Sequence, residues 1–274
     1  MPRLFGIIGN RSDFTRRVLA GAVGDARVRA GARPLAWGIG MHDAGEVLLR
    51  RRPIDEREEV EVRTLISDAR AEVLVGHVRR PEIGSNSTEN TQPFRYRQWL
   101  YAQTGVLAAA AELRDELFTN LPEFLKSAIA GQTDSELVFA TALSFLRDQS
   151  LLDFGASPTA IADALRSTAR LCASLAEQVG MVAAPMNHLV ADPERIVGYF
   201  ERPGAYVRAF TEARDFEEAL DDLDELKRRS VEFTRLRFFV VASDFDEPPA
   251  HEAWKSVPPG CSVTLSRGGI AFEN

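Results

Sequence analysis

Val73-Leu74-Val75-Gly76-His77-Val78-Arg79-Arg80 is the most informative segment of this sequence, together with Glu89-Asn90-Thr91-Gln92-Pro93-Phe94 shortly after it. A short apolar run that ends in His-Val-Arg is typical of a buried strand that delivers a cation at its C-terminal edge. The polar residues between the two pieces turn the chain, and Pro93-Phe94 starts it back toward the interior. A strand-end arginine often only reaches out to water, so this segment alone does not establish a site.

Composition places the chain among ordinary globular proteins. Its 274 residues are enough for one large domain or two small ones, and 45% are apolar while 27% are charged. The net charge of −7 argues against nonspecific nucleic-acid binding, which needs a basic surface. The sequence shows neither an apolar run of membrane-spanning length nor the pattern of a secretion signal, so we expect a cytoplasmic protein without nucleic-acid or membrane partners.

The two cysteines and four histidines give no support for a metal site or another cofactor. Cys172 and Cys261 are too few for a disulfide framework or a cysteine-rich metal centre. The histidines are scattered, without the spacing of zinc ligands, so no metal and no cofactor is expected. Cys172 falls on the apolar stripe of a predicted helix, which indicates a core residue rather than a nucleophile.

Apolar runs predict the strands of the first hundred residues. Leu4–Gly9 is a short buried strand, and the runs 35–41 and 46–49 flank an Asp/Gly turn, as in a β-hairpin. Further predictions in this region are a solvated strand end at Arg50-Arg51-Arg52, a surface helix over 58–69 and a strand over 96–102.

The middle of the chain is predicted to be helical. Thr133-x-x-Glu136 is a capping box, and Ser157-Pro158 provides a cap and a first-turn proline before an apolar stripe that ends at Gly180. The same kind of pattern predicts an Ala-rich helix over 107–117, a hairpin of 187–191 with 195–200, an acidic helix over 212–229, a strand over 237–243 and a hairpin of 262–265 with 270–272. Strands, then helices, then strands favour mixed sheets covered by helices.

Four pieces of the sequence together resemble the class II glutamine amidotransferases, an N-terminal-nucleophile (Ntn) hydrolase family. They are Met1-Pro2-Arg3-Leu4-Phe5-Gly6, Trp37-Gly38-Ile39-Gly40, the strand ending at Arg79, and Gly131-Gln132-Thr133-Asp134-Ser135-Glu136. The resemblance extends to the C-terminal segments and is nearest to the small, stand-alone branch. It implies an α+β fold, a four-layer α/β/β/α sandwich, formed by residues 1–274 as a single domain. Members of the family hydrolyse glutamine and pass the ammonia to a synthetase domain or partner.

The resemblance also implies which residues bind substrate. Arg79 matches the arginine that holds the α-carboxylate of glutamine, and Asp134 matches the aspartate that holds the amino group. Trp37 and Glu82 are further candidates for substrate binding, and Glu82 would add a carboxylate beside the pocket. Asp134 also has a purely structural explanation, because a carboxylate in a first helical turn interacts favourably with the helix dipole. Arg79 also has a purely structural explanation, because it could form a salt bridge with a nearby carboxylate.

The catalytic positions depart from the family pattern. Pro2 stands where the family has its nucleophilic cysteine, so no side-chain nucleophile follows the initiator methionine. The oxyanion-binding His-Asn-Gly segment is Gln103-Thr104-Gly105, and Gln92 replaces a further histidine. Losing one oxyanion donor costs roughly 100- to 1,000-fold in rate, and losing the nucleophile costs far more.

Three functions remain open at this stage. The first is a non-hydrolytic pseudoenzyme that binds or regulates a protein partner: a synthetase, a ligase or a related amidotransferase. The second is a sensor of glutamine or a similar amino acid, with Arg79 for the carboxylate and Asp134 for the ammonium group. The third is an active amidohydrolase that uses the exposed secondary amine of Pro2 after removal of Met1. Measuring ammonia release separates the third function from the other two.

Overall fold

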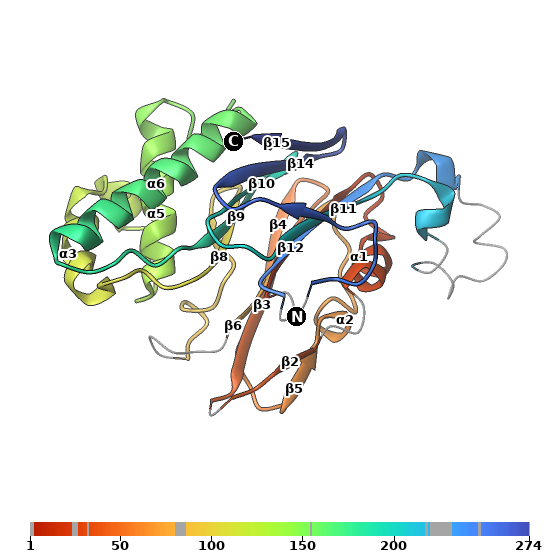
Figure 1. Cartoon of the computed structure of the whole chain (residues 1–274), viewed down its shortest axis with the longest axis horizontal. Helices are drawn as coiled ribbons and strands as arrows, with labels where there is room; N and C mark the ends of the chain where they lie inside the picture. Colours follow the sequence, from red (N-terminus) through yellow and green to blue (C-terminus); the bar gives the residue numbers. More distant parts are fainter. Residues whose placement is uncertain are drawn as a thin grey trace.

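A computed structural model describes residues 3–23, 27–31, 33–79, 86–153, 155–216, 219, 232–245 and 248–273. Two large sheets lie face to face with helices on both outer sides, as Figure 1 shows. The order of the seven-stranded sheet is β13 (Lys255–Val257), β11 (Ala205–Phe210), β12 (Phe238–Ser243), β1 (Leu4–Gly9), β6 (Val73–Arg79), β3 (Leu35–Asp43) and β4 (Glu46–Asp55). The order of the six-stranded sheet is β15 (Gly269–Glu273), β14 (Cys261–Ser266), β10 (Arg195–Phe200), β9 (Asn187–Ala191), β8 (Trp99–Thr104) and β7 (Phe94–Tyr96).

Three apolar layers hold these four layers of structure together. The layer between the sheets contains Leu4, Val75 and Leu100, each fully buried. A second layer joins the seven-stranded sheet to α1 (Thr15–Val23) and α2 (Val62–Leu65), which lie near the small pair β2 (Arg27–Arg29) and β5 (Glu59–Glu61). The predicted four-layer α/β/β/α sandwich of Ntn-hydrolase type is therefore confirmed.

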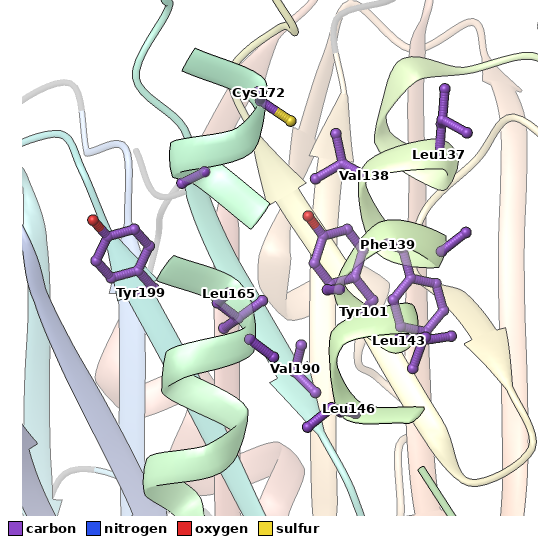
Figure 2. Close-up of a cluster of buried hydrophobic side chains, with 14 of the residues drawn as sticks. Tyr101, Leu137, Val138, Phe139, Leu143, Leu146, Leu165, Cys172, Val190 and Tyr199 are labelled. Carbon is purple, nitrogen blue, oxygen red and sulfur yellow. The ribbon is translucent and has the colours of Figure 1, made fainter. Parts of the chain in front are cut away.

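The third apolar layer lies between the six-stranded sheet and the helices α3 (Ala110–Asn120), α4 (Glu123–Lys126), α5 (Asp134–Asp148) and α6 (Pro158–Gln178). Figure 2 shows Cys172 and Leu165 of α6 on the side that faces Tyr101 and α5. The Tyr101 and Phe139 rings stack with their centroids 4.8 Å apart. Cys172 is buried there, and burial raises the pKa of its thiol to about 12, so its prediction as a core residue is confirmed.

The helix caps are confirmed in part. The Thr133 hydroxyl accepts a hydrogen bond from the Glu136 amide at 3.3 Å, and the Ser157 hydroxyl accepts one from the Ala160 amide at 3.1 Å. The second half of the predicted capping box differs. The Glu136 carboxylate accepts hydrogen bonds from the amides of Ala130 and Gly131 and so fixes the loop before the helix.

Three other predictions need correction or fall outside the described residues. The helix expected over 58–69 is a short strand, β5, followed by the single turn α2. The strand expected over 96–102 is two strands, because Arg97 adopts a left-handed conformation (φ 53°) and turns β7 into β8. Most of the acidic helix expected over 212–229 lies outside the described residues, and Ala213–Phe216 forms a 3₁₀ turn.

The strand β4 forms one edge of the seven-stranded sheet. Arg50, Arg51 and Arg52 lie within this strand rather than at its end, and Pro53 follows them. The pairing register between β3 and β4 shifts at this point, between Leu35 and Trp37. In the described residues, no helix has the length and apolar character needed to cross a membrane.

Candidate functional site

The main cleft lies where several strands end. It has a volume of about 410 Å³ and receives residues from the ends of β6 and β8 and from the start of α5. Its lining contains most of the residues singled out from the sequence: Arg79, Gln92, Gln103, Thr104, Gly105, Thr133, Asp134 and Ser135. It also contains Arg3, His77 and Arg202, which the sequence analysis had not assigned to a site.

Arg79 is the last residue of β6 and projects at the cleft. Its Nη1 donates a hydrogen bond to the backbone oxygen of Asn90 at 3.0 Å. The Asn90 side chain in turn accepts a hydrogen bond from the backbone amide of Gln132 at 2.8 Å. The loop after β6 is thereby tied to the loop before α5, and this connection holds Arg79 and Asp134 on the same cleft.

Asp134 is the first residue of α5, so its carboxylate lies at the positive end of the helix dipole. One oxygen accepts a hydrogen bond from the Leu107 amide at 2.7 Å, and the other accepts one from the Ser135 amide at 2.9 Å. A carboxylate has about four lone-pair positions, so these two bonds leave room for a ligand donor. Backbone amides therefore orient the Asp134 carboxylate and leave some of its lone-pair positions available to a ligand.

A polar network surrounds Thr104 on another part of the cleft. The Thr104 hydroxyl donates to Oδ2 of Asp244 at 2.5 Å and accepts from Nη2 of Arg202 at 2.8 Å. The same Arg202 nitrogen forms an ion pair with Oδ1 of Asp244, and the Ser243 hydroxyl donates to Oδ2 at 2.7 Å. Asp244 is held in a left-handed conformation (φ 61°), which aspartate tolerates better than most residues.

Hydrogen bonds and a tight turn fix the positions of the two residues next to Thr104, Gln103 and Gly105. The side-chain oxygen of Gln103 accepts a hydrogen bond from the Tyr101 hydroxyl at 2.5 Å. The backbone N–H of Gln103 donates to the side-chain oxygen of Gln92 at 2.6 Å. Gly105 has a positive φ of 103°, and a Cβ atom there would approach the backbone oxygen of Pro185 to 2.9 Å. Only glycine fits this turn without strain.

His77 lies two residues before Arg79, on the same face of β6. It lines the cleft but is only 4% exposed. Its Nδ1 atom has no hydrogen-bond partner within the described part of the chain. Burial, together with the positive charges of Arg3 and Arg79, lowers the pKa of His77 to about 3. The imidazole is therefore neutral at neutral pH.

Three residues predicted for the site are placed differently or are not described. Trp37 does not line the cleft, although its strand pairs with β6, and its Nε1 donates to Oδ2 of Asp55 at 2.8 Å. Pro2 and Glu82 lie outside the described residues.

The site residues missed by sequence reasoning follow strands directly. Arg202 lies two residues after β10, and Asp244 comes immediately after β12. Arg3 precedes β1, with one guanidinium nitrogen 3.8 Å from Oδ1 of Asp244. A charged residue beside the end of a predicted buried strand is the sequence signal that would have found all three.

Two sequence comparisons bear on this geometry. Residues 1–273 match the family model described as class II glutamine amidotransferases. The chain is also 23% identical over 262 residues to an uncharacterised protein from Methanocaldococcus jannaschii. That alignment covers 90% of this chain and 65% of the relative, so the chain spans less than two thirds of the relative's length.

Solved structures share the fold. A glutamine aminotransferase class II domain protein from Silicibacter pomeroyi superposes with a TM-score of 0.60 at 16% identity, covering 99% of this chain and 98% of that one. Glutamine phosphoribosylpyrophosphate (PRPP) amidotransferase from B. subtilis superposes with a TM-score of 0.52 at 14% identity, covering 98% of this chain but 48% of that one. At such identities the likeness shows the fold alone.

Proposed function

Since this chain belongs to the class II glutamine amidotransferase family, we propose that it binds an amino acid in the cleft without hydrolysing it. The observation that carries the proposal is the hydrogen bond from the Thr104 hydroxyl to Asp244 at 2.5 Å. Thr104 occupies the position that resembles the side-chain oxyanion donor of the family, and here its hydrogen is directed to a carboxylate. The hydroxyl is therefore not available to stabilise the oxyanion that forms during amide hydrolysis.

The described hydroxyls of the cleft are not paired with an unoccupied base. Amide hydrolysis by a hydroxyl needs a base within hydrogen-bond reach of it. The Thr104 hydroxyl donates to Asp244, a carboxylate that is already paired with Arg202. The Ser135 hydroxyl donates a long hydrogen bond of 3.4 Å to Asp134, a carboxylate that already accepts from two backbone amides. Cys172 is buried, and its raised pKa of about 12 keeps it a thiol at neutral pH. These features support binding rather than turnover.

Arg79 and Asp134 supply the recognition in this proposal. A guanidinium and a carboxylate on one cleft match the α-carboxylate and α-ammonium groups of an amino acid. Each charge-assisted hydrogen bond contributes about 1.5–3 kcal/mol, which gives micromolar to millimolar affinity after the entropic cost of binding. The volume of about 410 Å³ is in the usual range for a small-ligand pocket.

The test combines calorimetry with ammonia detection on the purified chain. We expect binding of glutamine or glutamate, no ammonia release, and a loss of affinity of roughly tenfold to a hundredfold in Arg79→Gln and Asp134→Asn. Arg235→Gln is the matched control, because Arg235 is 81% exposed and pairs with Glu232 away from the cleft lining. This control is expected to bind like the wild type.

Ammonia release that disappears in Arg79→Gln would show an enzyme and contradict the proposal. Intact-mass measurement would then decide between mechanisms. An amidohydrolase that uses the Pro2 amine requires Met1 to be absent from the active protein.

A protein partner is the second candidate, and an exposed apolar segment favours it. Val179, Met181 and Val182 are exposed after α6, Val182 by 88%, and Pro185 shortly after them lines the cleft. In B. subtilis PRPP amidotransferase the matched region is about half of the chain, so the fold there is joined to a second region. If the partner is a synthetase or ligase that covers this segment, Val182→Glu should weaken its binding and leave amino-acid binding unchanged.

A further inference from the structure

We propose that Arg3 and Arg202 form an anion subsite in the cleft, and that the ligand is an amino acid with an acidic side chain, such as glutamate, rather than the amide. The inference rests on the proposed function, because it assumes that Arg79 and Asp134 hold the α-carboxylate and α-ammonium groups. It adds a second carboxylate position, formed by residues outside that pair.

Among the described residues, the positive charges next to Asp244 outnumber the negative ones. Arg202 forms its ion pair with Oδ1 of Asp244, and Arg3 lies 3.8 Å from the same oxygen, beyond hydrogen-bond distance. The other oxygen of Asp244 already accepts hydrogen bonds from two hydroxyl groups, those of Thr104 and Ser243. One carboxylate thus interacts with two guanidinium groups, and its interaction with Arg3 is the weaker of the two.

Arg3, His77 and Arg202 all line the cleft. The Nε atom of Arg202 and the Nδ1 atom of His77 are buried without a hydrogen-bond partner among the described residues, and neither is exposed to the cleft. A ligand carboxylate in the cleft would therefore be held by the charges and the outer guanidinium nitrogens of Arg3 and Arg202 rather than by these two atoms.

A carboxylate fits these groups better than a carboxamide. Two guanidinium groups present only donors. A carboxylate offers acceptors alone and carries the missing negative charge, whereas an amide places its own N–H₂ donors against some of these donors. The two guanidinium groups of Arg3 and Arg202 therefore favour an acidic side chain over an amide.

The experiment is a calorimetric titration of the full chain with L-glutamate, L-glutamine, glutarate and inorganic phosphate. The wild type is expected to bind glutamate at least about tenfold more tightly than glutamine. Arg3→Gln is expected to weaken glutamate binding by roughly tenfold to a hundredfold and to change glutamine binding by less than about twofold. Arg235→Gln serves again as the matched control and should keep the preference.

Equal affinity for glutamate and glutamine, no binding of either, or a preference that survives Arg3→Gln would overturn the subsite. Competition by phosphate but not by glutarate would also overturn it, because the subsite would then prefer a tetrahedral anion. Ammonia is measured in the glutamine samples. Its release would contradict the proposed function, while the loss of glutamate preference in Arg3→Gln would still support the subsite.

Discussion

The two polar parts of the cleft are built in different ways. Arg79 and Asp134 are oriented by backbone groups: the oxygen of Asn90 and the amides of Leu107 and Ser135. Thr104, Arg202 and Asp244 are oriented by one another, through side-chain bonds that join residues far apart in sequence. The first part keeps residue types that resemble those of the family, and the second contains a replaced one, Thr104.

This difference shows where side chains can change without loss of the fold. The backbone groups that Arg79 and Asp134 contact are placed by the loops and the helix, whichever side chains line the other part of the cleft. The part around Thr104 depends on side chains that compensate one another, and a change there needs a matching change in its partners. Single substitutions should therefore disturb the second part more strongly than the first.

Asp244→Ala should lower the stability of the fold more than any other single substitution considered. A small loss would contradict the difference drawn between the two parts of the cleft. The substitution leaves Arg202 without its partner ion and removes the acceptor of two hydroxyl groups. Removing one member of a buried ion pair costs about 3–5 kcal/mol in the free energy of unfolding. Urea denaturation followed by circular dichroism measures this loss.

Asp244→Asn is the matched control, because asparagine keeps an acceptor and tolerates the left-handed backbone. It should lose clearly less stability than the alanine variant. A loss below about 1 kcal/mol in Asp244→Ala would mean that the network does not stabilise the fold.

Lowering the pH by one unit, in the window where three buried histidines titrate, should produce an effect of similar size. Burial lowers the pKa of His77 and His188 to about 3 and that of His42 to about 4. In the unfolded chain each titrates near 6.5, so between these values the unfolded state binds more protons and stability falls as pH falls. Each histidine contributes about 1.4 kcal/mol per pH unit in that window.

Urea denaturation at several pH values between about 4.5 and 7 measures the slope. His77→Gln should reduce it by one histidine's share. An unchanged slope in His77→Gln would show that the pKa of His77 is the same in the folded and the unfolded chain, which would contradict its lowering by burial.

Thr104→Val should produce the smallest effect, and it tests how much one hydroxyl contributes to the network around Asp244. Valine keeps the shape but removes the hydroxyl, so Asp244 loses one of its donors while Ser243 and Arg202 remain. We expect a loss of about 1 kcal/mol in stability and amino-acid affinity within about twofold of the wild type. Thermal unfolding and calorimetry on the same sample test both, and a tenfold loss of affinity would assign Thr104 to ligand binding.

Local sequence patterns predicted the elements whose signals lie within a few residues. The apolar run of β6 and the caps at Thr133 and Ser157 each place an element correctly. The turn at Arg97 had no glycine or asparagine to mark it, so two strands were predicted as one. The Glu136 carboxylate accepts hydrogen bonds from two amides before the helix rather than from the amide of the N-cap residue. This choice depends on the path of the loop, which the Thr-x-x-Glu spacing does not specify.

The site divides in the same way. Arg79 and Asp134 stand in recognisable motifs, and the structure brings both to the cleft. The contact between Thr104 and Asp244 spans 140 residues, and that between Arg202 and Asp244 spans 42. Such pairs follow from the order of strands in two sheets, which a single sequence does not specify.

The edge strand β4 has a consequence for the protein in concentrated solution. An unpaired edge of ten residues is a template on which a second chain could add a strand and begin aggregation. The guanidinium groups of this strand are occupied within the chain, because Arg50 is paired with Asp68, Arg51 donates to the backbone oxygen of Pro93 and Arg52 lies 3.7 Å from Asp55. Pro53 lies where the register shifts, and proline cannot donate to a new ladder. Pro53 therefore limits the addition of a second chain at this end of the edge.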